Sequence, residues 1–409
     1  MDSTGRQLDL FTLDAVLAVY SEAGGEEVSN QQLYEEVGRR VRATEAIEQK
    51  APVGKARAPR SLATRKIRWH QQTCRAMGLL ERVPGKRGAW RYTGSDVEKR
   101  GEAVPGRVLI AFSTDLGIAI WAHWEDVLHR LDTTISLVVT SPPYLLATPR
   151  AYGGIRDEAA YIDFITRAIE PVVANLAPGG SIALNLGNAC FEPGRPSRRL
   201  YQHKLILKLC SEFGLELMDN IIWFNTSAPP SPMQWASRTR QQLNASYESI
   251  IWLTNDAKKC TADNRRVLEP HSERHQALID AGGEKRTADF SDGAYRIRPG
   301  SFSNPTPGKI PRNVWPLGHR DRESIACNAY ANQHGYLTHG APMPLALADR
   351  LVRFLSAPGE LVLDMFAGRL TTARAAEMNG RRWIAVEKIA DHLAVAKEVR
   401  FGQGRTTSP

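Results

Sequence analysis

The chain has 409 residues, of which 42% are hydrophobic and 24% charged, and its formal net charge is +9. The length predicts two or three folded units, and the composition excludes a disordered or fibrous protein. No apolar run approaches the roughly 20 residues that span a bilayer, and the N-terminus lacks the basic-then-apolar pattern of a secretion signal. The five cysteines are scattered without a CxxC pair, which argues against a zinc cluster or a disulfide framework. We therefore expect a cytoplasmic protein without membrane contact, a metal or disulfides.

The first 100 residues carry a strongly uneven charge. Between residues 50 and 91 there are twelve basic residues and one acid, Glu81, a net charge of +11 that exceeds that of the whole chain. Residues 1–49 are acidic instead. So basic a segment favours a polyanionic partner, and we expect double-stranded DNA and association with the nucleoid of a bacterial-type cell.

Helical spacing of apolar residues, followed by β-forming runs, predicts helices and then a hairpin in this region. The expected elements are helices at 10–20, 31–41 and 61–77, the second capped by Ser29 or Asn30, and strands at 79–83 and 89–93. Residues 51–60, rich in Pro, Gly and basic side chains, predict a loop. Helices followed by a basic-tipped hairpin resemble a winged helix, whose third helix enters the major groove. The candidate phosphate contacts are Arg65, Lys66, Arg68, Arg75, Lys86 and Arg87. The alternative is a helical interaction or dimerisation domain with a solvated basic face.

From about residue 105, strands and helices alternate, which is typical of an α/β domain with a mostly parallel sheet. The expected strands lie at 108–111, 135–140, 181–186, 215–224, 247–253, 361–364 and 383–387. The expected helices lie at 157–176, 200–213, 344–355, 371–379 and 390–400, with a further helix ending over 126–131 and a turn at 177–180. Residues 225–339 break this rhythm, and such an insert usually carries specificity or an interface. We therefore divide the chain into an N-terminal domain at 1–100 and a catalytic domain at 105–400 that contains the insert at 225–339.

A buried strand, Leu361–Asp364, runs into a tight turn and a helix, and Asp364 stands at the strand tip. Such a turn forms a binding crevice at the carboxyl edge of the sheet. Glu387 ends the next strand, 19 residues after Gly368, where an acid can accept hydrogen bonds from ribose hydroxyls. The motif predicts a nucleotide-like cofactor, and the alternative is an ordinary strand-loop-helix turn with surface acids.

A second buried strand ends in Thr140-Ser141-Pro142-Pro143-Tyr144. The two prolines remove backbone donors and stiffen the loop, so that carbonyls can point into a cleft. An exocyclic amino nitrogen is a poor nucleophile, and acceptors at Ser141 Oγ and the Pro142 carbonyl would direct its lone pair towards an electrophile. Tyr144 offers a flat surface for a base taken out of the helix. The alternative is a rigid strand end with the tyrosine as packing.

Together, these motifs resemble the permuted (β-class) DNA amino-methyltransferases, in which the catalytic loop precedes the cofactor loop. The resemblance covers about 108–400 and includes the motifs at 181–188, 247–252, 339–344 and 361–387. It implies a Rossmann-like methyltransferase domain with a mostly parallel seven-stranded sheet and S-adenosylmethionine as the methyl donor. It also implies that the insert is a target-recognition region.

The resemblance assigns roles residue by residue. Ser141, Pro142, Pro143 and Tyr144 match the catalytic loop. The residues that match the cofactor site are Pro344, Asp364, Phe366, Ala367, Gly368, Thr371 and Glu387. Serine at the first loop position is typical of relatives that methylate cytosine N4, whereas aspartate is more typical of adenine N6.

The cofactor turn departs from the family pattern, which has Pro after the aspartate and Ser-Gly before the threonines. Here Met365, Arg369 and Leu370 stand at these positions. Leucine adopts positive φ at a cost, so either the turn is reshaped or its dihedrals never needed glycine. Arg369 is a candidate partner for the carboxylate of the cofactor or for a DNA phosphate.

We therefore predict a site-specific DNA methyltransferase that acts on cytosine N4 of a flipped-out base. The alternatives are adenine-N6 methylation, a DNA-binding protein with a degenerate methyltransferase domain, and methylation of a protein glutamine. The order of the motifs and the basic segment disfavour the last of these. Cytosine-C5 chemistry needs a thiolate nucleophile, and the chain has no Pro-Cys loop. A cognate restriction endonuclease is a candidate partner, and the chain is expected to be a monomer or a homodimer.

Overall fold

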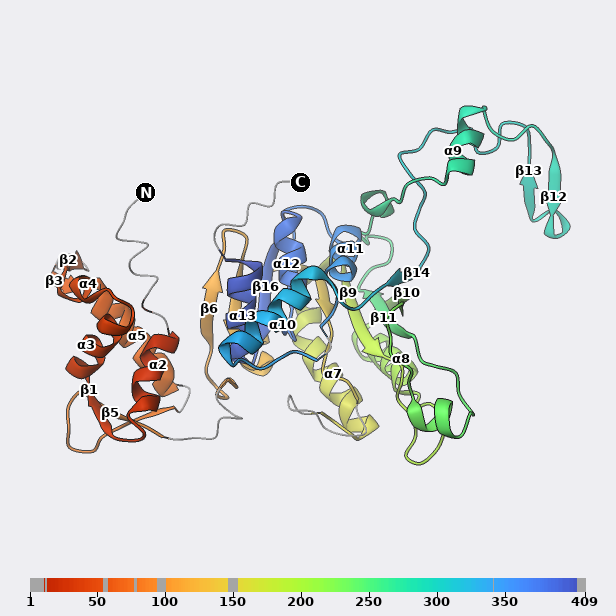
Figure 1. Cartoon of the computed structure of the whole chain (residues 1–409). Coiled ribbons are helices and arrows are strands. Elements are labelled where there is room, and N and C mark those ends of the chain that lie inside the picture. Colours follow the sequence, from red (N-terminus) through yellow and green to blue (C-terminus); the bar gives the residue numbers. More distant parts are fainter. Residues whose placement is uncertain are drawn as a thin grey trace. The chain divides into compact units, whose positions relative to one another are not determined.

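The computed structural model forms two compact units (Figure 1). One unit comprises the described residues up to Leu109 together with 121–126 and 388–390, and the second comprises the rest. The structure describes residues 11, 13–53, 58–76, 79–93, 101–145, 154–340 and 342–402.

Helices and a small sheet build the N-terminal unit. Its elements are α2 (Leu13–Glu22), β1 (Glu27–Ser29), α3 (Asn30–Arg40), α4 (Thr44–Glu48), β2 (Lys50–Val53), β3 (Ala58–Ser61), α5 (Leu62–Ala76), β4 (Leu80–Arg82) and β5 (Ala89–Tyr92). Ser29 caps α3 through a reciprocal capping box with Gln32, which confirms one of the two expected caps. Tyr20, Leu33 and Ile67 are fully buried in the core of this unit.

Two predictions for this unit need revision. The loop expected at 51–60 is wrong, because β2 and β3 pair in antiparallel register from Lys50–Ser61 to Val53–Ala58. The expected hairpin is present, but β5 also pairs with β1, giving a three-stranded sheet in the order β1-β5-β4. The strand β1 is only three residues long, so it leaves little alternating pattern to detect.

Within the described residues, the second unit is organised on a nine-stranded mixed sheet. Its order is β14 (Val314–Leu317), β10 (Glu216–Asn225), β11 (Tyr247–Thr254), β9 (Leu176–Gly187), β8 (Ile135–Thr140), β15 (Leu361–Asp364), β16 (Arg382–Glu387), β7 (Gly117–Trp121) and β6 (Leu109–Ser113). The central run β9-β8-β15-β16 is parallel, whereas β11 is antiparallel to both of its neighbours. Leu137, Val138 and Leu363 in the parallel strands are completely buried, as expected for strands covered on both faces.

The expected count of seven strands is therefore wrong for this sheet. All seven predicted strands are present, and β7 and β14 add to them. The turn expected at 177–180 is also wrong, because β9 already begins at Leu176. The side chain of Asn255 accepts a hydrogen bond from Gly179 N and donates to the carbonyls of Leu176 and Ala177. The backbone N–H and C=O groups of this Pro-Gly segment therefore have hydrogen-bond partners although the segment lies in a strand and not in a turn.

Helices alternate with the strands of this sheet, as the sequence predicted. They are α6 (Trp124–Leu128), α7 (Glu158–Ala174), α8 (Tyr201–Phe213), α11 (Leu345–Leu355), α12 (Thr371–Met378) and α13 (Ala390–Arg400). None of the described helices is long and apolar enough to cross a membrane.

The insert is more ordered than its irregular sequence suggested. It contains η2 (Met233–Arg238), η3 (Asn264–Val267), α9 (Glu273–Asp280), β12 (Ala288–Phe290), η4 (Ser291–Gly293), β13 (Tyr295–Ile297) and α10 (Arg322–His334), as well as β14. In Figure 1, β12 and β13 form a two-stranded ribbon that belongs to a separate sheet. The helix α10 begins at a capping box formed by Asp321 and Ser324.

Candidate active site

The predicted catalytic loop begins where β8 ends, at the carboxyl edge of the parallel strands. Ser141, Pro143 and Tyr144 are half-buried, and Pro142 is buried. The residues that follow in sequence, 146–153, lie outside the described part of the chain. The carboxyl edge of a parallel sheet is where α/β domains bind their ligands.

A hydrogen-bonded cluster surrounds the hydroxyl of Tyr144. This hydroxyl donates to Glu248 Oε2 over 2.6 Å and accepts from Ser141 Oγ at 3.5 Å. Asn185 Nδ2 donates to the same Glu248 oxygen at 3.0 Å and approaches the Tyr144 hydroxyl at 3.3 Å. Burial, followed by the charge of Glu248, raises the pKa of Tyr144 well above its usual range. The phenol is therefore a neutral donor at physiological pH.

The ring of Tyr144 lies against the backbone of Gly187 at the end of β9. A Cβ at position 187 would come within 3.2 Å of the ring, so glycine allows this close approach. The aromatic ring is thus in close contact with the end of β9.

Asn185 and Glu248 are site residues to which the sequence analysis gave no role. They come from the neighbouring strands β9 and β11, in which Glu248 pairs with Gly187 and Ile250 with Asn185. A usable signal was present, because an amide in an otherwise apolar buried strand is costly unless it has a partner. Asn185 is only 1% exposed, and its partners come from elements distant in sequence.

The catalytic and cofactor motifs meet through one hydrogen bond. Thr140 Oγ1 donates to Asp364 Oδ1 over 2.7 Å, although the two residues are 224 positions apart. The bond is possible because β8 and β15 are neighbouring parallel strands, in which Leu137 pairs with Val362. Asp364 also accepts from the backbone N–H of Phe366. The structure thus brings the two predicted motifs to one edge.

Asp364 is buried, and burial raises its pKa from 3.8 to about 6 in spite of the hydrogen bonds from Thr140, Thr372 and Phe366, which lower it. A carboxylate in this position is poorly solvated, so it gains more than a surface carboxylate from a ligand that donates hydrogen bonds or carries positive charge.

Glu387 lies at the end of β16, next to the turn after β15. Its Oε2 accepts a hydrogen bond from Gly368 N at 2.7 Å. Gly368 has φ +48°, and a Cβ there would come within 2.9 Å of His339 Nε2. The turn, the acid and His339 therefore lie close together around Gly368, where a side chain would require the His339 ring to shift.

The backbone of Leu370 shows how the unusual cofactor turn is built. It has φ 56° and ψ 38° and serves as the N-cap of α12, while its side chain is completely buried. The turn therefore keeps a left-handed residue, and leucine bears a conformational cost that glycine would avoid, of about 1–2 kcal/mol. Phe366 packs on Phe164, Ala367 is buried, and Thr371 begins the helix.

Arg369 is held by the chain itself. It is 3% exposed, and its guanidinium donates to Asn328 Oδ1 and to the carbonyl of Leu337. The suggested contact with a DNA phosphate is therefore wrong for this structure. Instead, Arg369 joins the cofactor turn to α10 and to the segment that leads to Pro344, the N-cap of α11.

Comparisons with known proteins agree with this arrangement. The family model described as DNA methylase matches residues 135–398. The type II methyltransferase M.PvuII of Proteus hauseri is 30% identical over 270 residues, which span 66% of this chain and 79% of that protein. The DNA adenine methyltransferase YhdJ of Escherichia coli is 29% identical over 157 residues, or 38% of this chain and 45% of that one.

A solved structure, PvuII DNA methyltransferase (cytosine-N4-specific), has the same fold. It superposes with a TM-score of 0.56 at 24% identity and covers 73% of this chain and 90% of that chain. The chain belongs to the N6/N4 DNA methylase family. It is thus a DNA methyltransferase, and the expected α/β fold is confirmed at this level.

Family membership also confirms the expected donor, S-adenosylmethionine. The residues at the edge of the sheet fit such a group, because His339 Nδ1 and Arg369 Nε are buried there without a hydrogen-bond partner among the described residues. Burial lowers the pKa of His339 to about 3, so its ring is neutral and offers one donor and one acceptor.

The predicted DNA contacts lie in the N-terminal unit. On α5, Arg65, Arg68 and Arg75 are exposed, and Lys66 is half-buried. Neither Arg65 nor Arg68 forms an ion pair within the part of the chain that the structure describes. On the hairpin, Arg87 is exposed, whereas Lys86 binds Glu27.

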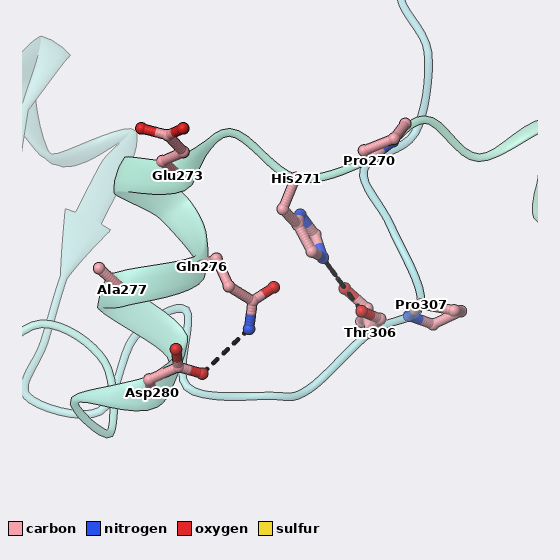
Figure 2. Close-up of a pocket in the computed structure, with 8 residues that line it drawn as sticks. All are labelled: Pro270, His271, Glu273, Gln276, Ala277, Asp280, Thr306 and Pro307. Carbon is pink, nitrogen blue, oxygen red and sulfur yellow. Dashed lines mark hydrogen bonds between the residues drawn. The ribbon is translucent and has the colours of Figure 1, made fainter.

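A separate cavity lies in the insert, between α9 and the irregular segment that carries Thr306 and Pro307 (Figure 2). His271 Nε2 faces Thr306 across it, and Gln276 is hydrogen-bonded to Asp280. No cluster of three His, Cys, Asp or Glu side chains suited to a metal ion occurs in the described ranges.

Proposed function

We propose that this methyltransferase modifies the exocyclic N4 of cytosine in double-stranded DNA. The observation that carries the proposal is Ser141, which opens the catalytic loop and lies within reach of the Tyr144 hydroxyl. The similarity of this chain to a relative whose solved structure is described as cytosine-N4-specific supports cytosine as the target base.

In this proposal, Ser141 Oγ and the carbonyl of Pro142 accept the two amino hydrogens of the target base. Pro143 keeps the loop rigid, because its ring fixes φ. Tyr144, whose ring is in contact with Gly187, stacks on the base. The loop therefore fixes the amino lone pair in one direction.

The cofactor half of the site lies on the other side of the Thr140–Asp364 bond. Asp364 and the backbone of Phe366, Ala367 and Gly368 would hold the cofactor, with Thr371 at the N-terminus of α12 and Pro344 at that of α11. Glu387 would take the ribose hydroxyls. When bound, S-adenosylmethionine supplies an electrophilic methyl group on a sulfonium. The intact turn favours an active enzyme over a degenerate one, and calorimetry with S-adenosylmethionine tests this.

The base is identified by its product. The protein is incubated with DNA and labelled S-adenosylmethionine, the DNA is digested, and the labelled nucleoside is identified. We expect N4-methylcytosine. N6-methyladenine would instead favour the activity named for YhdJ and would overturn the cytosine assignment.

Substitutions in the two halves of the site should separate binding from turnover. We expect Ser141→Ala and Tyr144→Ala to reduce turnover by about 100-fold or more with nearly unchanged cofactor affinity. Asp364→Ala should weaken cofactor binding first. Titration calorimetry and methyl-transfer rates on the same preparations measure both effects, and loss of cofactor binding in Ser141→Ala would contradict the division.

The N-terminal domain, which we assign to residues 1–100, is proposed to bind DNA as a winged helix. The order of its elements supports this fold, because the described helices α2, α3, α4 and α5 precede the β4–β5 hairpin and β1 completes the sheet. In this proposal α5 enters the major groove, where Arg65, Lys66, Arg68 and Arg75 contact phosphates, and Lys86 and Arg87 do so from the hairpin. Lys86 must exchange Glu27 for phosphate, so we expect the smallest contribution from it.

Within the catalytic domain at 105–400, the insert at 225–339 is proposed to recognise the target sequence. Exposed aromatic residues on its two-stranded ribbon, Phe290 and Tyr295, are 45% and 50% exposed and suit contact with bases. A cognate restriction endonuclease is proposed as a partner, in keeping with the type II designation of M.PvuII.

A further inference from the structure

Glu248 stands at the end of a chain of hydroxyl groups that starts at the catalytic loop. Ser141 Oγ donates to the Tyr144 hydroxyl, and that hydroxyl donates to Glu248 Oε2. A carboxylate can only accept hydrogen bonds, so it fixes the direction of every donor in the chain. With its own hydrogen turned to Tyr144, Ser141 presents lone pairs to any group on its other side.

We propose that Glu248 is a positioning residue for methyl transfer, which makes Ser141 an acceptor and takes up the proton that the target amino group releases. This inference rests on the proposed function, because it requires an exocyclic amino group at Ser141. The 3.5 Å distance between Ser141 and Tyr144 is long, as is common for catalytic hydrogen bonds before substrate binds.

The chain of hydroxyl groups, or relay, accounts for the proton that the methyl transfer releases. The amino nitrogen forms the new N–C bond as the C–S bond breaks and the sulfonium becomes a neutral thioether. The nitrogen then gives one proton to Ser141 Oγ, while the hydrogen of Ser141 moves to Tyr144 and that of Tyr144 moves to Glu248. The carboxylate becomes a neutral carboxylic acid, so no other co-reactant is needed.

Asn185 keeps Glu248 in place for this role. Its Nδ2 donates to the Glu248 oxygen that also accepts from Tyr144, and its own Oδ1 is buried without a hydrogen-bond partner among the described residues. A buried amide oxygen without a hydrogen bond lowers the stability of the folded protein. Keeping Asn185 in spite of this cost indicates a functional role for the carboxylate that its amide nitrogen binds.

Within the part of the chain that the structure describes, few other titratable groups surround Glu248. Tyr144 from the catalytic loop and Asn185 from β9 face it, and Trp223 of β10 is its partner across the ladder. Tyr201 of α8 acts on Tyr144 electrostatically and donates to the carbonyl of Gly187. Burial raises the pKa of Glu248, and the two hydrogen bonds oppose this shift. The carboxylate form therefore forms at a higher pH than in an ordinary glutamate.

The test compares the full-length chain with Glu248→Gln in single-turnover methylation across pH. We expect the rate of the unsubstituted chain to rise with pH as Glu248 ionises, because the relay needs the carboxylate. Glu248→Gln keeps the shape but removes the charge, so it should lower the rate by about 100-fold and abolish this acidic limb. Glu216→Gln, at the opposite end of β10 from the Trp223–Glu248 pair, is the matched control and should keep both the rate and the limb.

A second variant guards against a folding defect. Tyr144→Phe keeps the stacking ring and leaves Glu248 in place but breaks the relay, so it should lose the same limb. The double variant should be no slower than the slower single variant, because both act through one chain of hydrogen bonds. Calorimetry with S-adenosylmethionine and the thermal midpoint should stay near those of the unsubstituted chain.

The outcomes separate this inference from the proposed function. If the unsubstituted chain methylates DNA but Glu248→Gln keeps its rate and its acidic limb, or the two substitutions are additive, the relay is overturned alone. Formation of N6-methyladenine would overturn the cytosine assignment and leave the relay intact, because that base also presents an exocyclic amino group. A chain that binds cofactor but methylates no DNA would overturn both.

Discussion

Asp364 is a buried carboxyl group whose negative charge lowers the stability of the free protein and strengthens the binding of a ligand that donates hydrogen bonds or carries positive charge. Burial raises its folded pKa to about 6, above the 3.8 of an ordinary aspartate. The stability that such a group contributes is fully present below the unfolded pKa and is lost as pH rises through the folded pKa. In the free protein, this loss therefore falls between about pH 4 and pH 6.

Asp364→Asn should remove this loss. We expect the asparagine chain to gain stability over the unsubstituted chain as pH rises from 4 to 6, and to stay ahead by roughly 3 kcal/mol above pH 7. Urea unfolding of both chains without cofactor, at a series of pH values, measures the difference, in which other titrating groups cancel. Parallel stability curves would show that Asp364 is not destabilised by its burial.

At the scale of an element, the turn from β15 to α12 combines a strained backbone with a buried side chain. Leu370 occupies the left-handed region, and its side chain is completely buried. Packing in the core outweighs the conformational cost, because removing a buried leucine side chain costs about 2–5 kcal/mol whereas the backbone strain is about 1–2 kcal/mol. This comparison explains why leucine is tolerated where the family pattern has glycine.

Two substitutions at this position distinguish strain from packing. Leu370→Gly and Leu370→Ala both lose the side chain, but only glycine relieves the backbone, so the glycine variant should be more stable than the alanine variant by about 1 kcal/mol. Leu347 in α11 is the matched control, since it is also fully buried but lies within a helix. There, alanine should be the more stable by about 1 kcal/mol. Chemical denaturation of the four variants gives the result, and the same order at both positions would contradict the strain.

At the scale of the whole molecule, positive charge is concentrated in residues 50–91 of the N-terminal unit. The exposed arginines of α5 give that unit a basic surface, whereas Arg39, Arg40 and Arg91 of the same unit are paired with glutamates. Arg65 and Arg68 form no ion pair among the described residues, and Arg75 lies over the ring of Trp90 rather than beside a carboxylate, so no ion pair has to be broken before these arginines bind phosphate.

A triple substitution in the full chain tests this surface. Replacing Arg65, Arg68 and Arg75 with alanine should weaken DNA binding and reduce the slope of log K against log[salt] by up to about 3, or roughly 0.9 per lost phosphate contact. The control is Lys208→Ala/Arg382→Ala/Lys397→Ala, which removes the same charge from the catalytic unit. Fluorescence anisotropy at several salt concentrations measures both slopes. An unchanged slope in the arginine variant would show that α5 does not contact phosphates.

The sequence alone determined the class of fold, the two motifs and the chemistry they favour. This was possible because buried strands such as 135–140 and 361–364 are short apolar runs, and the polar residues that follow such runs stand at the edge of a sheet. Seven strands were therefore predictable, whereas β7 and β14 were not. The strand β14 lies in the irregular insert and contains Pro316, a residue that argues against a strand.

Only the tertiary structure decided how the site is joined. Thr140 meets Asp364, and Tyr144 meets Asn185 and Glu248, because strands far apart in sequence are neighbours in the sheet. It also decided that Leu370 keeps a left-handed backbone and that Arg369 is buried against Asn328. Hydrogen-bond partners and the cost of burial depend on what surrounds a side chain in space, and a linear pattern does not contain that information.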